Sequence, residues 1–218
     1  MKLIVSDFDN TFYSDNYEEN IILINEFVNK GNLFVIATGR PFDLLKKDIQ
    51  NKNIAFEYLI CTDGAVVYDK DFNILKLDYM NKLVALKILE ELKENKNIEK
   101  VYLNIENDFI CGVYGLYKDY KKAKQLLEII KTNYDVDGYL GLHWINIINK
   151  NITKIDGIEY VKNKINIKDS DIYTIGDNVN DLTMINKYNG FIISQNNQNN
   201  CVKNFKEFME KINESNIN

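Results

Sequence analysis

The stretch Lys2-Leu-Ile-Val-Ser-Asp-Phe-Asp-Asn-Thr-Phe12 decides the fold. Its apolar run, Leu3 to Val5, predicts a short strand buried on both faces, as strands of a parallel sheet are. Asp7 and Asp9 follow at positions i and i+2, so we expect both to point into one pocket at the carboxyl edge of that sheet. Such a pair repels itself unless a cation lies between the carboxylates or one is protonated. The pattern fits phosphoryl chemistry, with Asp7 as nucleophile and Asp9 as proton donor and acceptor, although acidic residues after a strand also serve as turn formers or helix N-caps.

A second apolar strand, Leu33 to Ala37, ends in Thr38, Gly39 and Arg40 at the predicted start of a helix. This junction offers a hydroxyl, free backbone N–H groups and the positive end of a helix dipole, which together bind an anion. An ordinary strand-to-helix turn explains this piece equally well.

A late strand, Asp171 to Ile175, runs into Asp177 and Asp181. Because the carboxyl ends of parallel strands meet at one edge, these loops are expected to converge. Several carboxylates in one crevice need a hard divalent cation, typically Mg²⁺, and Lys154 is the expected counter-charge to Asp7. The residues expected at this edge are Asp7, Asp9, Thr38, Asp177 and Asp181.

The middle of the chain has a different predicted order of elements, which is helix, two strands, helix, two strands between Asn81 and Ile148. An antiparallel unit that interrupts a β/α alternation predicts an inserted small α+β domain. We therefore expect an α/β core domain at residues 1–78 and 150–218 and an α+β domain at 79–149. The Asn- and Gln-rich residues 195–200 are expected to form a surface loop.

Composition excludes several function classes. The formal charge of −5 and the lack of a Lys/Arg stripe argue against nucleic-acid binding, and 45% hydrophobic residues are enough for a real core. Three widely spaced cysteines fit reduced thiols better than disulfides or a zinc site. The chain has no leader-like start and no apolar run near about 18 residues, so we expect a cytoplasmic location and no membrane partner. The protein is further expected to be a monomer or weak dimer.

Four motifs, in this order, resemble those of the haloacid dehalogenase superfamily, and within it the Cof-type phosphatases. They are Asp7-Phe-Asp-Asn-Thr11, Ala37-Thr-Gly-Arg40, Asn151-Ile-Thr-Lys-Ile-Asp-Gly-Ile158 and Gly176-Asp-Asn-Val-Asn-Asp181. The resemblance implies a Rossmann-like parallel sheet with a small α+β cap, inserted between the second and third motifs, that selects the substrate.

The resemblance also implies roles. Asp7 would attack phosphorus and form an aspartyl-phosphate, while Asp9 would protonate the leaving alcohol and then deprotonate water. Mg²⁺ would be held by the Asp7 carboxylate, the Asp9 backbone carbonyl and Asp177, with Asp181 steadying its water ligands. The groups expected at the phosphate or elsewhere on the substrate are Thr38, Gly39, Arg40, Lys154 and Asn180. Arg40 would bind a second anionic group or pair with a cap carboxylate.

The sequence departs from the family pattern at Asn10, where Gly is common, and at Asp63, which stands where Asn is usual. Asp63 is expected either to face the leaving group or to cap a hairpin. The leading hypothesis is a Mg²⁺-dependent phosphatase of small phosphorylated metabolites, sugar phosphates by default. The alternatives are a phosphotransferase such as a hexose-phosphate mutase, a non-enzymatic phospho-acceptor domain and a binding protein.

Overall fold

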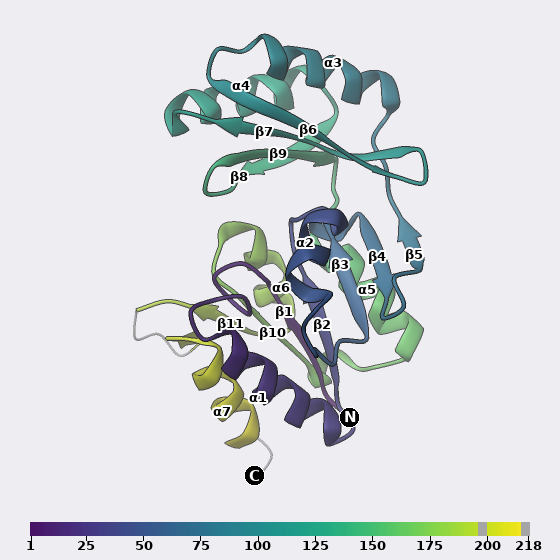
Figure 1. Cartoon of the computed structure of the whole chain (residues 1–218), viewed down its shortest axis with the longest axis vertical. Helices are drawn as coiled ribbons and strands as arrows, with labels where there is room; N and C mark the ends of the chain where they lie inside the picture. The colour runs from purple at the N-terminus through teal and green to yellow at the C-terminus, as the bar shows by residue number, and fades with distance from the viewer. Residues whose placement is uncertain (196–199, 215–218) are drawn as a thin grey trace. The chain divides into compact units, whose positions relative to one another are not determined.

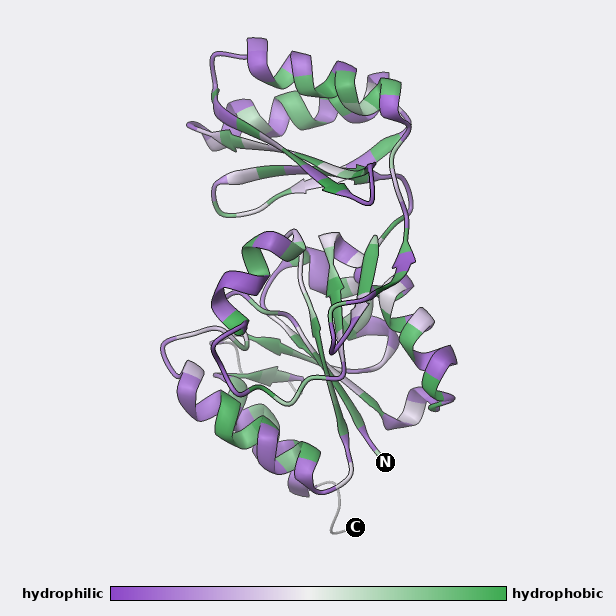
Figure 2. Ribbon diagram, turned by 45° about the vertical axis from the view of Figure 1, so that its right-hand side comes forward, coloured by the Kyte–Doolittle hydropathy of each residue, from purple (hydrophilic) through white to green (hydrophobic). Residues whose placement is uncertain are grey.

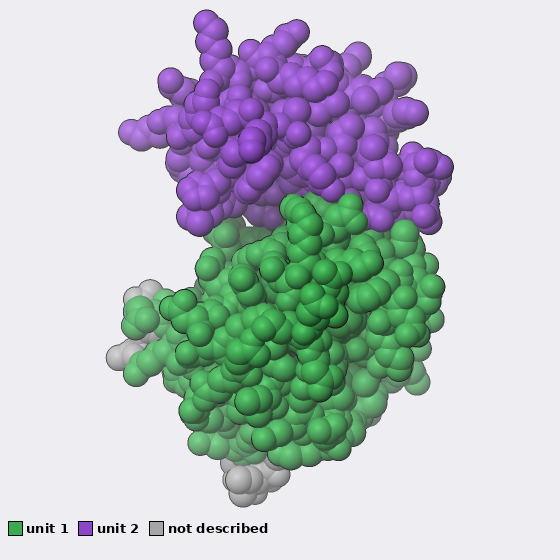
Figure 3. Space-filling view, in the orientation of Figure 1, with its two compact units in different colours: residues 1–75, 153–218 green, residues 76–152 purple. Residues whose placement is uncertain are grey.

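The computed structural model describes residues 1–195 and 200–214, and the chain divides into two compact units (Figure 3). Unit 1 consists of residues 1–75 and 153–218, and unit 2 consists of residues 76–152. The sequence predicted the domain boundaries between residues 78 and 79 and between residues 149 and 150. Residues 196–199 of the predicted surface loop lie outside the described residues.

Unit 1 is built on an eight-stranded sheet of order β12-β11-β10-β1-β2-β3-β4-β5 (Figure 1). Strand β1 lies in its middle, parallel to β10 on one side and to β2 on the other, so Leu3 pairs with both Ile172 and Leu33. The strand pairing changes from parallel to antiparallel between β3 and β4. This confirms the predicted α/β fold with a parallel-sheet core. The strands are β1 (Leu3–Ser6), β2 (Leu33–Ala37), β3 (Tyr58–Cys61), β4 (Val66–Asp69), β5 (Ile74–Leu77), β10 (Ile172–Gly176), β11 (Asn189–Ile193) and β12 (Cys201–Val202).

Helices cover both faces of this sheet, which explains why its central strands are mostly apolar (Figures 1 and 2). On one face the ring of Phe12 lies 4.9 Å from that of Phe34 and 5.2 Å from that of Phe205. On the other, Ile158 and Met184 pack with the buried side chains of β1 and β2. The helices are α1 (Tyr17–Asn29), α2 (Phe42–Ile49), α5 (Lys154–Ile165), α6 (Leu182–Lys187) and α7 (Phe205–Glu214).

Unit 2 is an antiparallel sheet of order β6-β7-β9-β8 with two helices on one face (Figure 1). Its own core joins the helices to the sheet, for example through Ile88, Ile130, Val113 and Ile147, all buried. This is the inserted α+β architecture that the sequence predicted. Its elements are α3 (Lys82–Glu94), β6 (Ile98–Glu106), β7 (Phe109–Tyr117), α4 (Tyr120–Asn133), β8 (Val136–Leu140) and β9 (Trp144–Asn149).

Within the described residues no helix is both long and apolar enough to pass through a lipid bilayer. The expected cytoplasmic location and oligomeric state stay predictions.

One surface ion-pair cluster ties α5 to α6. The Glu159 carboxylate accepts hydrogen bonds from Tyr188 Oη at 2.5 Å and from Lys162 Nζ at 3.4 Å, and pairs with Lys187 Nζ at 2.8 Å. Burial disfavours the charged form, but the bonds from Lys187 and Tyr188 outweigh it and lower the pKa of Glu159 from its ordinary 4.5 to about 2. The folded state therefore favours the carboxylate, and this stabilisation is complete above pH 4.5 and is lost as the pH falls toward 2.

We expect Glu159→Gln to lower the free energy of unfolding by about 1–2 kcal/mol near pH 7, a figure reduced for solvent screening. The difference from the wild type should shrink as the pH falls below 4.5. Urea unfolding of both proteins between neutral pH and pH 3 measures it. Glu210→Gln, at an exposed position of α7, should show no such pH-dependent difference.

Candidate functional site

The site begins where β1 ends. The Asp7 backbone N–H donates to the Ile175 carbonyl at 2.9 Å, which extends the pairing of β1 with β10 by one residue. The following loop folds back on itself, since the N–H of Tyr13 donates to the Phe8 carbonyl at 2.7 Å. The buried Asp7 side chain is thereby fixed at the carboxyl edge of the sheet.

Lys154 comes to the same edge from the first residue of α5. Thr153 caps that helix in a capping box with Asp156, and the carbonyl of Thr153 packs so closely on Gly64 that a Cβ there would lie 2.0 Å from it. The Lys154 side chain is fully buried, with Nζ 2.5 Å from Asp7 Oδ1 and 2.6 Å from Asp181 Oδ1. Burial disfavours the ammonium, but the carboxylates of Asp181 and Asp7 outweigh it and raise the pKa of Lys154 above its ordinary value.

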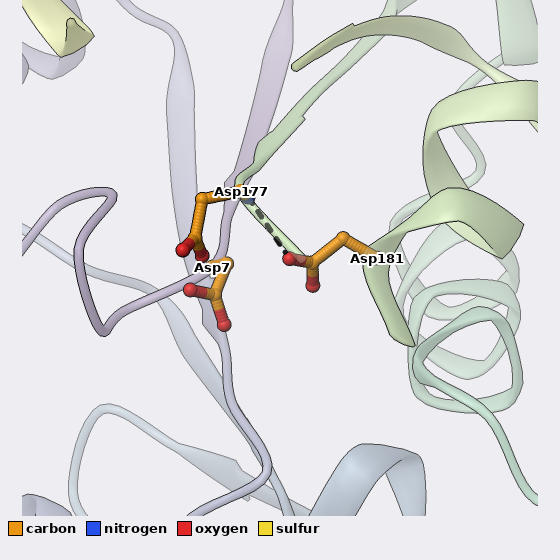
Figure 4. A group of neighbouring side chains, drawn as sticks. All are labelled: Asp7, Asp177 and Asp181. Atoms are coloured by element: carbon orange, nitrogen blue, oxygen red, sulfur yellow. Dashed lines mark hydrogen bonds between the residues drawn. The ribbon is translucent and has the colours of Figure 1, made fainter. Parts of the chain in front are cut away.

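Asp177 and Asp181 complete an acidic cluster with Asp7 (Figure 4). Asp181 Oδ2 accepts the backbone N–H of Asp177 at 3.1 Å and that of Asn178 at 3.0 Å, so its other oxygen is left to Lys154. One carboxylate oxygen from each of the three aspartates lies within 4.8 Å of the others. Burial raises the pKa of Asp7, with Lys154 opposing, and burial and the Asp181 charge raise that of Asp177. A metal ion would offset this excess negative charge.

Gly176, the last residue of β10, leaves the space for this cluster. A Cβ there would lie 2.4 Å from both Cγ and Oδ2 of Asp181. We expect Gly176→Ala to displace that carboxylate and to lower by about 100-fold any activity that depends on the cluster, the typical cost of misplacing a site group by about 1 Å. Steady-state assays at saturating metal measure the loss. Ile175→Val, one residue earlier, should retain activity, and an active Gly176→Ala protein would contradict the steric argument.

Thr38, Gly39 and Arg40 follow β2 on the neighbouring loop. The Thr38 hydroxyl accepts the backbone N–H of Arg40 at 3.1 Å. The backbone N–H of Thr38 donates to the Ile60 carbonyl at 2.8 Å. Arg40 does not project freely toward a substrate: its guanidinium binds both oxygens of Asp9, with Nε to Oδ2 at 2.7 Å, and binds Asp48. Burial opposes the charge of Arg40, but Asp9 and Asp48 outweigh it and raise its pKa.

Asp63 links two of the loops at this edge. Its Oδ1 accepts from Asn180 Nδ2 at 2.9 Å, and its N–H donates to the Thr38 carbonyl at 3.1 Å. Thr62 and Asp63 both have left-handed backbones, with φ of 52° and 53°. A β-branched residue in that region is uncommon and signals a strained, closely determined turn. Of the two expectations for Asp63, neither describes this contact with Asn180.

The structure thus brings together Asp7, Asp177, Asp181 and Lys154, with Asp63 and Asn180 linked beside them. The Asp9 carboxylate lies with Arg40 instead of in the acidic cluster, which differs from the expectation that Asp7 and Asp9 share one pocket. The pairing of Arg40 with Asp48 was not predicted, nor was the Thr11 hydroxyl that donates to Asp177 Oδ1 at 3.4 Å. Asp48 stands eight residues after Arg40 on α2, and nothing in the local pattern marks that pairing.

Comparison with known proteins decides the family. A profile of haloacid dehalogenase-like hydrolases matches residues 4–125 and 99–217, which together span nearly the whole chain. The chain belongs to the haloacid dehalogenase-like hydrolases. This confirms the resemblance stated from the four motifs.

Relatives of this haloacid dehalogenase-like hydrolase carry phosphatase names. The 5-amino-6-(5-phospho-D-ribitylamino)uracil phosphatase of Bacillus subtilis is 26% identical, over 98% of this chain and 91% of its own. A protein of Buchnera aphidicola (subspecies Baizongia pistaciae), provisionally named a phosphatase, is 23% identical over 84% of this chain and 82% of its own. The predicted enzyme class, a phosphatase of this family, is confirmed by the family match and these relatives.

Solved structures share the fold. A HAD/Cof-like hydrolase of Plasmodium vivax superposes with a TM-score of 0.82 at 16% identity, over 98% of this chain and 96% of that one. A subclass IIB sugar phosphatase of the same superfamily gives 0.77 at 16% identity, over 98% and 99%. At this identity the likeness is one of fold.

Proposed function

We propose that this haloacid dehalogenase-like hydrolase is a Mg²⁺-dependent phosphatase that hydrolyses small phosphorylated metabolites through an aspartyl-phosphate at Asp7. The observation that carries the proposal is the buried Lys154 ammonium, shared by Asp7 and Asp181 with Asp177 beside them. A structural ion pair needs one carboxylate. A site with three carboxylates and a single buried cation fits a cluster that gains a divalent ion and a phosphoryl group.

The residues fit Mg²⁺ by their chemistry. All side-chain donors of the cluster are carboxylate oxygens, which suit hard cations such as Mg²⁺ better than softer transition metals. The pKa values of Asp7 and Asp177 are raised, so the cluster has more negative charge than Lys154 alone offsets. Asp7, the Asp9 backbone carbonyl, Asp177 and Asp181 are the groups we assign to hold it. When bound, the ion supplies charge stabilisation for the transferring phosphoryl group.

Asp7 performs the first displacement. Its free carboxylate oxygen attacks phosphorus, the bond from phosphorus to the substrate oxygen breaks, and Asp9 gives its proton to that leaving oxygen. In the second displacement a water oxygen attacks phosphorus, its proton passes to Asp9, and the bond to Asp7 breaks. Inorganic phosphate leaves and both aspartates return to their starting states.

The remaining groups bind the phosphate. Lys154 neutralises charge on its oxygens and holds Asp7 in place, a role that its complete burial favours. The Thr38 hydroxyl and the Gly39 N–H belong to the loop that leads into α2, and the dipole of that helix also favours an anion before its first turn. We assign Asn180 to the phosphoryl group or its water, with Asp63 fixing its amide.

Unit 2 is proposed to select the substrate, and sugar phosphates are its first candidates. The test is a panel of phosphorylated sugars, nucleotides and cofactors, assayed for released phosphate. It should include 5-amino-6-(5-phospho-D-ribitylamino)uracil, the compound named in the Bacillus subtilis relative. Transfer of the phosphoryl group to an added acceptor in place of water would identify a phosphotransferase instead. No release from any compound, including p-nitrophenyl phosphate, would refute the proposal.

We expect EDTA to abolish turnover of p-nitrophenyl phosphate and Mg²⁺ to restore it, because three carboxylates with Lys154 as their one buried cation cannot also hold a phosphate dianion without a metal ion. Phosphate release before and after chelation measures the effect. Ca²⁺, which accepts looser geometry, should restore less. Activity that survives EDTA, or that only zinc restores, would contradict the assigned metal.

A further inference from the structure

Lys154 is bracketed by a hydrogen-bonded pair of residues at the start of α5. Thr153 lies directly before it in the chain, and Asp156 lies in the same turn of the helix. Asp156 Oδ2 accepts the backbone N–H of Thr153 at 2.8 Å and the Thr153 hydroxyl at 3.0 Å. The Asp156 N–H donates to the Thr153 carbonyl at 2.9 Å. The backbone on both sides of Lys154 is therefore tied together through Asp156.

A second contact holds the same turn from the side of the sheet. Gly64, in the turn after β3, has a φ of 105°, and a Cβ there would lie 2.0 Å from the Thr153 carbonyl oxygen. Gly64, Thr153 and Asp156 all belong to unit 1, whereas the chain that leads into Thr153 belongs to unit 2. The start of α5 is thus anchored by residues of unit 1.

The position of Lys154 makes this anchoring necessary. Lys154 is the first residue of α5, where a cation meets the positive end of the helix dipole and where backbone N–H groups have no acceptor within the helix. Its buried side chain nevertheless places Nζ 2.5 Å from Asp7 Oδ1 and 2.6 Å from Asp181 Oδ1. Helix formation alone does not favour that placement, so other contacts have to hold it.

We propose that Asp156 and Gly64 are positioning residues for Lys154. They hold the first turn of α5 so that the ammonium stays between Asp7 and Asp181. Both act through the backbone that carries Lys154. This inference rests on the proposed function and deepens it. An ammonium that is displaced offsets less of the negative charge of the cluster, so loss of the anchor should lower turnover and strengthen Mg²⁺ binding together.

Asp156→Ala tests the proposal, because it removes the acceptor of both Thr153 donors. We expect kcat for p-nitrophenyl phosphate to fall by about 10- to 100-fold, the cost of a misplaced site group. We also expect Mg²⁺ to raise the thermal unfolding midpoint of this variant by more than it raises that of the wild type, because a tighter ion stabilises more. Asp156→Asn loses the charge but keeps an oxygen that accepts, so it should retain most of the activity and the wild-type response to Mg²⁺.

The double variant tests whether the effect passes through the ammonium. In Lys154→Met the ammonium is already absent, so adding Asp156→Ala should not increase the response of the unfolding midpoint to Mg²⁺ any further. Gly64→Ala should reproduce both effects of Asp156→Ala. Asp156 is only partly buried, so Asp156→Ala should fold even if Gly64→Ala does not.

Asp119→Ala is the matched control. The Asp119 side chain caps α4 in unit 2, where it accepts the backbone N–H of Lys122 at 2.9 Å. Its removal should therefore destabilise the protein as the loss of a helix cap does, with turnover of p-nitrophenyl phosphate and the response to Mg²⁺ unchanged.

An Asp156→Ala protein with the wild-type response to Mg²⁺ would overturn the positioning role and leave an ordinary helix cap. A larger response in the double variant than in Lys154→Met would overturn it as well, since the effect would not pass through the ammonium. Equal losses in Asp156→Asn and Asp156→Ala would overturn it in favour of a role for the charge. In these cases an active wild type leaves the proposed function standing. A wild type that neither hydrolyses p-nitrophenyl phosphate nor responds to Mg²⁺ refutes the proposed function, and this inference with it.

Discussion

Asp7→Asn should leave a folded protein that no longer hydrolyses any phosphate ester, with kcat lower by at least about 10⁴-fold, as when a covalent nucleophile is removed. An amide is a poor nucleophile toward phosphorus, and its oxygen still accepts from Lys154. Folding should survive because burial raises the pKa of Asp7 and so already disfavours its charge in the absence of metal. Released phosphate and thermal unfolding measure the two effects.

A matched control separates the loss of the nucleophile from a general change of charge. Asp15→Asn removes a carboxylate from an exposed position in the loop between β1 and α1, and should retain wild-type activity. After mixing with substrate, the wild type should contain a phosphoryl group on Asp7 and the Asp7→Asn variant should contain none. Turnover by Asp7→Asn would contradict the assignment of the nucleophile.

The second large effect is expected at Lys154. Lys154→Met leaves Asp7 and Asp181 buried without their cation, and removing one partner of such a buried pair typically costs about 3–5 kcal/mol of stability. Activity should fall below detection because the phosphate loses its ammonium. Denaturant unfolding should show that this loss of stability is smaller at pH 5 than at pH 8. The reason is that a buried carboxylate with a raised pKa takes up a proton on acidification, which removes the unpaired charge.

Added Mg²⁺ should stabilise Lys154→Met more than the wild type, because the ion then supplies the only positive charge in the cluster. Lys162→Met is the control, since this lysine lies on the same helix but is partly exposed and pairs with Glu159 and Asp169 at the surface. It should cost at most about 1 kcal/mol. A Lys154→Met protein as stable and active as the wild type would mean that the lysine is not the central counter-charge.

The sequence predicted the sheet and the acidic edge because both are local patterns. Short apolar strands that end in polar residues specify a parallel sheet, and the rule that strand ends meet at one edge places Asp7, Asp177 and Asp181 together. The exact start of a helix depends on its cap: α4 begins at Tyr120 because the Asp119 side chain accepts the N–H of Lys122. Strand β6 begins at Ile98 because its pairing with β7 continues across an irregularity.

What the sequence did not predict are pairings between side chains of separate elements. The direction of the Asp9 carboxylate depends on Arg40, and that of Arg40 depends on Asp48, neither of which a strand or helix pattern encodes. The contact of Asp63 with Asn180 depends on the left-handed backbones of two successive residues, Thr62 and Asp63. The presence of threonine and aspartate at these positions does not predict that conformation. Such contacts follow from the assembled fold alone.

The arrangement of strands around β1 has a consequence for the order of assembly on the ribosome. Strand β1 needs β10 as its neighbour on one side, and the chain between them contains all of unit 2. An emerging chain can therefore finish the pairing of unit 2, one uninterrupted stretch, while an inner edge of unit 1 still lacks its partner. That open edge offers unpaired backbone groups to chaperones or to other nascent chains until residue 176 has left the exit tunnel.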